Sequence, residues 1–127
     1  MNGIICVAVG GALGASARYV AGLAIIRMTG YGFPYGTIGV NVFGSLLMGL
    51  LVGWLTHRAG GDENLRLFLG TGLLGGFTTF SAFSVDTVML YQRKAYGLMT
   101  AYVSASVGLS LAALVIGLLI MRKFAPA

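Results

Sequence analysis

Polar side chains recur at every fourth position in two otherwise apolar stretches of this chain. The two sets are Thr37, Asn41 and Ser45, and Tyr102, Ser106 and Ser110. Residues four apart lie on one face of a helix, so each set predicts a row of hydroxyl and amide groups. All of these groups can donate hydrogen bonds, which is what a dehydrated anion needs. Bonding between helices is the better explanation for any single Ser or Thr, but two parallel rows, one centred on an Asn amide, strengthen the case for an anion.

Phenylalanines add a second chemical feature, at positions Phe77, Phe80 and Phe83. An aromatic stripe at this spacing usually packs against a neighbouring helix. The edge of a phenyl ring is electropositive, however, and can face an anion. Ring edges beside hydroxyl groups are therefore a plausible environment for a small, hard anion.

These phenylalanines lie in a segment, Gly70–Asp86, that is rich in glycine, threonine and serine where a simple lipid-facing helix would carry leucine. Irregular backbone is tolerated inside a bilayer only where it is buried in protein or lines a cavity. Broken membrane helices often mark ion sites. The sequence therefore predicts an interrupted helix at this segment.

Two charged residues stand within apolar stretches, Arg18 and Asp86. Arg18 either extends its side chain to the membrane surface or provides a positive region that attracts anions and repels cations. For Asp86 we expect an ion pair with a basic side chain at the membrane edge.

The elements that carry these residues follow from composition. Of the 127 residues, 57% are hydrophobic and 9% are charged, whereas a soluble domain has roughly 25% charged residues. Stretches of about 20 apolar residues span a bilayer. Candidate spans cover Ile4–Ile26, Tyr35–Thr56, Leu65–Tyr91 and Tyr96–Met121. Links at 29–34, 57–64 and 92–94 separate them, so residues 1–127 are expected to form a single four-helix transmembrane domain, an all-α membrane protein.

The charges at the helix ends are nearly balanced. One side would hold Arg58, Arg66, Arg122 and Lys123, and the other Arg27, Arg93 and Lys94, with Arg18 inside the first span. Orientation normally follows an excess of Lys and Arg in cytoplasmic loops. A weak bias can still select one orientation, but we favour insertion both ways, with opposed copies pairing as inverted repeats do in transporters.

Other patterns indicate packing or lack the context they need. Glycines spaced as GxxxG, which let helices approach closely, are Gly10 and Gly14, Gly49 and Gly53, and Gly72 and Gly76. The GxGxxG at 70–75 has no preceding strand, so it is no dinucleotide motif. His57 is the only histidine and Cys6 the only cysteine, and no nucleophile–base pair is evident. We expect neither an enzyme nor a nucleic-acid-binding protein, since the basic residues form no stripe.

Three segments together resemble the CrcB-type fluoride channels, also called Fluc. They are GGALGASARY at 10–19, GTIGVNVFGS at 36–45 and GLLGGFTTFSAF at 72–83. The order and spacing are specific, and the resemblance covers all four spans. The chain departs from the family pattern at Leu74, where Cys is common, and at Ala82, where Thr is common.

The resemblance implies an antiparallel, dual-topology homodimer with two fluoride pores and a broken third helix. Phe80 and Phe83 would line each pore with ring edges and Asn41 would be a polar contact beside them. Thr37, Tyr102, Ser106 and Ser110 would continue a donor track. Ser81 and Arg18 are further residues expected at the fluoride pore. Backbone carbonyls of Gly75 and Thr78 from both copies would hold a structural Na⁺ on the two-fold axis. Function would be passive fluoride export through a bacterial-type cytoplasmic (inner) membrane.

Two other functions are weighed beside this one. A small four-helix multidrug exporter can also have dual topology, but it needs a membrane-embedded carboxylate, and the first span has Arg18 and no acid. A structural membrane protein without transport explains the glycine spacing but not the donors on three spans.

Overall fold

The computed structural model describes residues 2–56 and 63–124, which form helices joined by short non-helical segments and contain no strands. Four helical stretches are long and apolar enough to cross a membrane: Gly3–Thr29, Tyr35–Thr56, Glu63–Gln92 and Tyr96–Phe124. The four-span prediction is confirmed, and the ends differ from the predicted ones by at most three residues.

The first two spans are the single helices α1 (Gly3–Thr29) and α2 (Tyr35–Thr56). Asn2 caps the start of α1 by accepting a hydrogen bond from the Ile4 N–H at 2.9 Å. Gly30 ends α1, because its φ of 79° is a left-handed conformation that favours glycine. The predicted link at 29–34 is thus confirmed. Most of the next link, 57–62, lies outside the described residues.

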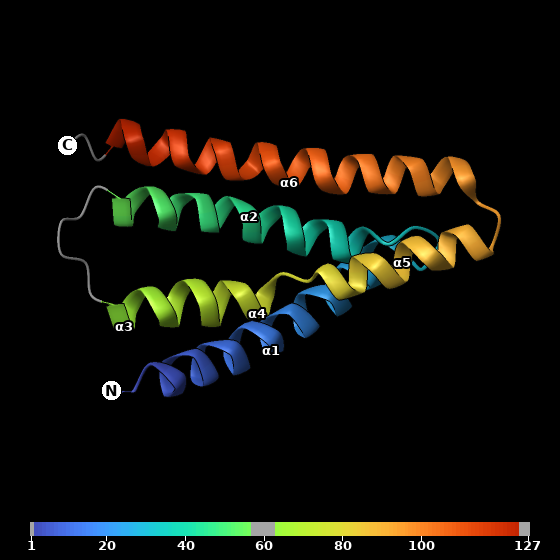
Figure 1. Cartoon of the computed structure of the whole chain (residues 1–127). Coiled ribbons are helices and arrows are strands. Elements are labelled where there is room, and N and C mark those ends of the chain that lie inside the picture. Colours follow the sequence, from blue (N-terminus) through green and yellow to red (C-terminus); the bar gives the residue numbers. More distant parts are fainter. Residues whose placement is uncertain (1, 57–62, 125–127) are drawn as a thin grey trace.

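The third span is divided into α3 (Glu63–Arg66), the π-helical η1 (Leu67–Leu74), α4 (Gly75–Phe77) and α5 (Phe80–Gln92). A turn at Arg93 and Lys94, where Lys94 has a φ of 58°, leads into α6 (Tyr96–Phe124). The start of α1, the end of α2, the start of α3 and the end of α6 lie at the same end of the bundle (Figure 1). Among the described residues, this arrangement places the basic residues at the two ends as the charge tally assumed, and Arg58 lies outside the described residues.

Close helix packing depends on glycine. Helix α2 packs along α6, and α1 packs on η1 and α4. A Cβ atom on Gly10 would lie 2.5 Å from the Phe68 carbonyl oxygen, and one on Gly76 would lie 2.8 Å from the Gly11 carbonyl oxygen. Gly49 and Gly53 of α2 meet α6 in the same manner. The packing role predicted for the GxxxG glycines is confirmed.

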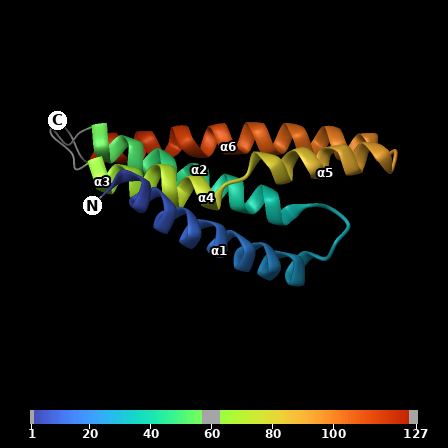
Figure 2. The same cartoon turned by 60° about the horizontal axis from the view of Figure 1, so that its bottom comes forward.

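Toward the link between α1 and α2, α1 diverges from α5 and α6 (Figure 2). The interior of this single chain is thin. Its buried apolar residues, among those described, are Cys6, Val40, Leu74, Leu90, Tyr102 and Ala113. Large apolar side chains such as Leu13, Val88 and Leu119 are instead exposed on the outer faces, as lipid contact or a partner chain requires.

Candidate functional site

Helix α4 ends at Phe77, and the next two residues leave the helical conformation. Thr78 has φ −84° and ψ 157°, and Thr79 has φ −149° and ψ 119°, both extended. The Asn41 side chain of α2 bonds both backbone groups of Thr79. Its Nδ2 donates to the Thr79 carbonyl oxygen at 2.9 Å, and its Oδ1 accepts from the Thr79 N–H at 2.7 Å. One side-chain amide thus replaces the hydrogen bonds that the helix no longer supplies.

Thr79 also starts the next helix. Its Oγ1 accepts a hydrogen bond from the Ala82 N–H at 3.1 Å, which makes Thr79 the N-cap of α5. Ser81, one of the predicted site residues, lies 3.1 Å from the same hydroxyl through its Oγ. Threonine before an apolar helix is an N-cap signal that sequence reasoning missed here.

These contacts release two backbone carbonyl groups, in the sense that the carbonyls lose the N–H donors that a continuous helix would give them. In an uninterrupted α-helix the carbonyls of Gly75 and Thr78 would accept from the N–H groups of Thr79 and Ala82. Those N–H groups donate instead to Asn41 and to the Thr79 hydroxyl. The Gly76 carbonyl accepts from the Arg18 Nε at 3.1 Å, so the first span also contacts this region through its arginine.

A groove of about 370 Å³ runs beside the extended residues, between α2, α5 and α6. We call it the phenylalanine groove. Its lining includes six predicted site residues: Asn41, Phe80, Phe83, Ser106 and Ser110 of the predicted pore, and Thr78 of the predicted Na⁺ site. The structure therefore brings together side chains from three helices that sequence reasoning had assigned to one site.

The phenylalanine groove combines aromatic rings with a hydroxyl group that forms no hydrogen bond to another described residue. The ring centroids of Phe80 and Phe83 lie 5.5 Å apart at 44°, and Phe80 is 78% exposed. Ser106 is only 6% exposed, and its Oγ makes no hydrogen bond to another described residue. A buried hydroxyl without a protein partner is costly unless another group binds it.

Asp86 is the centre of a second cluster. Its Oδ2 accepts hydrogen bonds from the Thr37 Oγ1 at 2.7 Å and from the Tyr102 hydroxyl at 3.0 Å. The expectation of a basic partner for Asp86 is wrong, because the ion pair found among the described residues joins Arg66 to Glu63 at 3.0 Å. The two hydroxyls offer Asp86 charge-assisted hydrogen bonds within the bundle, so it needs no cation.

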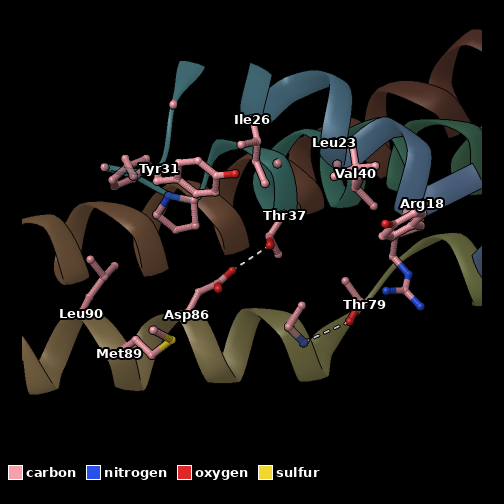
Figure 3. Close-up of a pocket in the computed structure, with 18 of the residues that line it drawn as sticks. Arg18, Leu23, Ile26, Tyr31, Thr37, Val40, Thr79, Asp86, Met89 and Leu90 are labelled. Carbon is pink, nitrogen blue, oxygen red and sulfur yellow. Dashed lines mark hydrogen bonds between the residues drawn. The ribbon is translucent and has the colours of Figure 1, made fainter. Parts of the chain in front are cut away.

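A larger hollow of about 460 Å³ lies where α1 diverges from the bundle (Figure 3). We call it the arginine pocket, because both Arg18 and Arg93 line it. Thr37 and Asp86 line it as well, and their hydrogen bond is drawn in Figure 3. Thr79 lines both the arginine pocket and the phenylalanine groove, so the extended residues separate two hollows on opposite sides.

The chain is similar to known proteins over nearly its whole length. The family model "CrcB-like protein, Camphor Resistance (CrcB)" matches residues 5–118. A protein of Caulobacter vibrioides strain NA1000 / CB15N is 52% identical over 124 residues, which cover 97% of this chain and 98% of the relative. A protein of Cereibacter sphaeroides strain ATCC 17029 / ATH 2.4.9 is 53% identical over 122 residues, which cover 96% of this chain and 96% of the relative. Both relatives are named "Fluoride-specific ion channel FluC".

Proposed function

The chain belongs to the CrcB-like family, and from this starting point we propose that it is a fluoride-selective channel that conducts the ion passively across a membrane. The names of its relatives support a channel and support neither the drug exporter nor the structural protein. Four helices long and apolar enough to cross a membrane support a multi-pass transporter.

The phenylalanine groove is the observation that carries the proposal. Fluoride is small and strongly hydrated, so a pathway must replace its water with closely spaced donors. The groove is lined by the rings of Phe80 and Phe83 and by Ser106, and the Ser106 hydroxyl meets no hydrogen-bond partner among the described residues. Hydroxyl protons and positive ring edges both attract an anion, and no carboxylate lies among the residues that line this groove.

The ion would enter through the arginine pocket. Arg18 contributes a positive charge to this pocket, and Thr79 lines both the pocket and the phenylalanine groove. Thr37 and Tyr102 direct their protons to Asp86 in this structure, so fluoride has to compete with the carboxylate for these two donors. Competition keeps binding weak enough for the ion to leave, as conduction requires.

A second copy is needed to complete the pathway. One chain leaves Phe80 78% exposed and the phenylalanine groove open on one side. We infer an antiparallel homodimer in which each copy closes the groove of the other, with the interrupted third span at the centre and two pathways in total. The near balance of basic residues supports opposed insertion.

The released carbonyls of Gly75 and Thr78 fit a structural Na⁺. Hard cations prefer oxygen ligands, and carbonyl oxygens are among them. Two carbonyls from each copy would hold the ion at the dimer centre, where it would neutralise their partial charges. Asn41 and Thr79 accept from the N–H groups that would otherwise bond to these carbonyls, which supports the proposed role of the carbonyls as Na⁺ ligands.

Physiologically, we propose export across a bacterial-type cytoplasmic membrane. Hydrofluoric acid is weak and crosses membranes in its neutral form, so fluoride accumulates in a cell whenever the medium is more acidic than the cytoplasm. A passive, selective channel then lets the anion leave down its gradient.

Efflux from reconstituted vesicles tests the function. Purified protein in vesicles loaded with fluoride should release it when a potassium ionophore balances the charge, whereas vesicles loaded with chloride should release little. Phe80→Ile and Phe83→Ile, which keep apolar volume but remove the ring edge, should lower fluoride efflux. Equal fluoride and chloride efflux would contradict a selective channel, and wild-type fluoride efflux in both variants would contradict ring-edge lining.

A further inference from the structure

Tyr102 lies between two aromatic rings, one of which belongs to a connecting segment. Its ring is fully buried, at 0% exposure. On one side is Phe83 of α5, with ring centroids 5.4 Å apart at 30°. On the other side is Phe33, from the segment between α1 and α2, at 5.7 Å and 85°, an edge-on contact. Together with Phe80, these rings form a continuous row that we call the aromatic row.

Phe33 is the member of the aromatic row that no function so far explains. It lies in the arginine pocket and not in the phenylalanine groove. Its backbone is fixed by neighbours: the Phe33 carbonyl accepts from the Tyr35 N–H at 2.8 Å, and the Gly32 carbonyl accepts from the Arg93 Nη2 at 3.3 Å. Arg93 thus joins the connecting segment to the end of α5. The ring of Phe33 is therefore held against Tyr102 by both its own segment and α5.

The position of the Tyr102 hydroxyl depends on these two rings. The phenol oxygen lies in the plane of the tyrosine ring, so the packing that sets the plane also sets where the oxygen is. Here the oxygen reaches Asp86 at 3.0 Å. Without Phe33, the Tyr102 ring would lose this edge-on contact and would face the arginine pocket. Aromatic pairs of this kind contribute about 0.5–1.5 kcal/mol beyond burial, enough to change a preferred orientation.

We propose that Phe33 is a positioning residue for fluoride conduction, which acts by holding the Tyr102 hydroxyl where it donates to Asp86, a residue that lines the arginine pocket. The proposal rests on the channel function proposed above. It makes the segment between α1 and α2 part of the pathway, although none of its residues lines the phenylalanine groove.

The test compares side chains at position 33 in the vesicle efflux assay. Phe33→Leu and Phe33→Ala should lower fluoride efflux by roughly 3- to 10-fold, the range expected when an aromatic pair is lost. Phe33→Tyr keeps the ring and should retain efflux close to wild type. Tyr35→Ala is the matched control, because Tyr35 packs on Phe33 with centroids 4.8 Å apart but makes no ring contact with Tyr102.

A double-mutant cycle separates positioning from a general structural role. If Phe33 acts through Tyr102, Phe33→Ala should cause no further loss of efflux in a Tyr102→Ala background. An equal loss in both backgrounds, or wild-type efflux in Phe33→Leu, would overturn the proposal. Should Phe33→Ala not yield folded protein, the comparison of Phe33→Leu with Phe33→Tyr decides alone. Absence of efflux in the wild type would instead refute the channel function itself.

Discussion

At the scale of single residues, Asp86 is the most informative departure from expectation. It lies in a membrane span beside a proposed anion pathway, where a negative charge repels fluoride. Its Oδ2 nevertheless accepts from both Thr37 and Tyr102. We infer that the carboxylate orients these donors and so determines where the hydroxyl protons are available.

Replacing Asp86 tests this role and separates a channel from a proton-coupled exporter. Asp86→Asn keeps an oxygen acceptor for the two hydroxyls, so most fluoride efflux should remain. Asp86→Leu removes the acceptor and leaves two buried donors unpaired, at about 1–3 kcal/mol each, so both efflux and thermal stability should fall. The measurements are vesicle efflux and the melting temperature of the purified protein. Complete loss of transport in Asp86→Asn would favour an exporter that exchanges protons at this carboxylate.

Sequence reasoning identified most of the side chains around Asp86 but not how they pair. The four-residue spacing correctly placed Tyr102, Ser106 and Ser110 on one helix face, and Thr37 and Asn41 on another. Spacing within one helix does not say which face meets a neighbouring helix. For that reason the Asp86 hydrogen bonds, and the contact between Phe33 and Tyr102, emerge only from the packing of separate elements.

At the scale of elements, Asn41 connects α2 to the extended residues between α4 and α5. Asn41→Ala would leave the N–H and the carbonyl of Thr79 without their side-chain partner. Each unpaired group inside a membrane domain costs about 1–3 kcal/mol, so the melting temperature should fall clearly. Ser45→Ala is the control, one turn along the same face of α2 and lining the same groove. Equal melting temperatures for both variants would show that the Asn41 amide does not hold this segment.

Helix α6 offers a matched pair of glycines for testing close packing. A Cβ atom on Gly117 would lie 2.5 Å from the Leu46 carbonyl oxygen of α2, whereas one on Gly108 would meet nothing within 4 Å. Gly117→Ala should therefore separate α2 from α6 and lower the melting temperature, with a cost in the roughly 1–3 kcal/mol range of overpacked cores. Gly108→Ala should be neutral or slightly stabilising, since alanine favours helix. Identical behaviour of the two variants would mean that α2 and α6 do not approach this closely.

The number and limits of the spans followed directly from the length of the apolar stretches and from Gly and Pro in the links. The π-helical form of η1 did not, because apolar periodicity over eight residues does not distinguish a π-helix from an α-helix. Gly117 was also missed. It lacks a glycine four residues away, and its role depends on Gly49 of α2, which lies against it.

At the scale of the whole molecule, the thin interior and the exposed outer faces require surroundings that a single chain does not supply. The exposed Phe80 beside an open groove supports the proposed second copy. The near balance of basic residues supports an antiparallel orientation of that proposed copy. Arg66, Arg122 and Lys123 belong to one end of the bundle, and Arg27, Arg93 and Lys94 to the other.

Opposed insertion predicts two-sided labelling. Gln92 is exposed at the end of α5, next to the turn before α6, and native Cys6 is buried, so Gln92→Cys provides one reactive thiol. A membrane-impermeant thiol reagent applied to intact cells or sealed membrane vesicles should label about half of the copies, because neither orientation has an excess of positive charge facing the cytoplasm. Permeabilisation should then expose the remainder.

Shifting the charge balance provides the control for this experiment. Replacing Arg93 and Lys94 with glutamine removes positive charge from one end while Arg122 and Lys123 remain at the other. All copies should then adopt one orientation, with labelling of Gln92→Cys becoming one-sided and fluoride efflux falling as antiparallel pairs disappear. One-sided labelling in the unaltered protein would contradict dual topology, and the second copy that closes the phenylalanine groove would then have to be parallel.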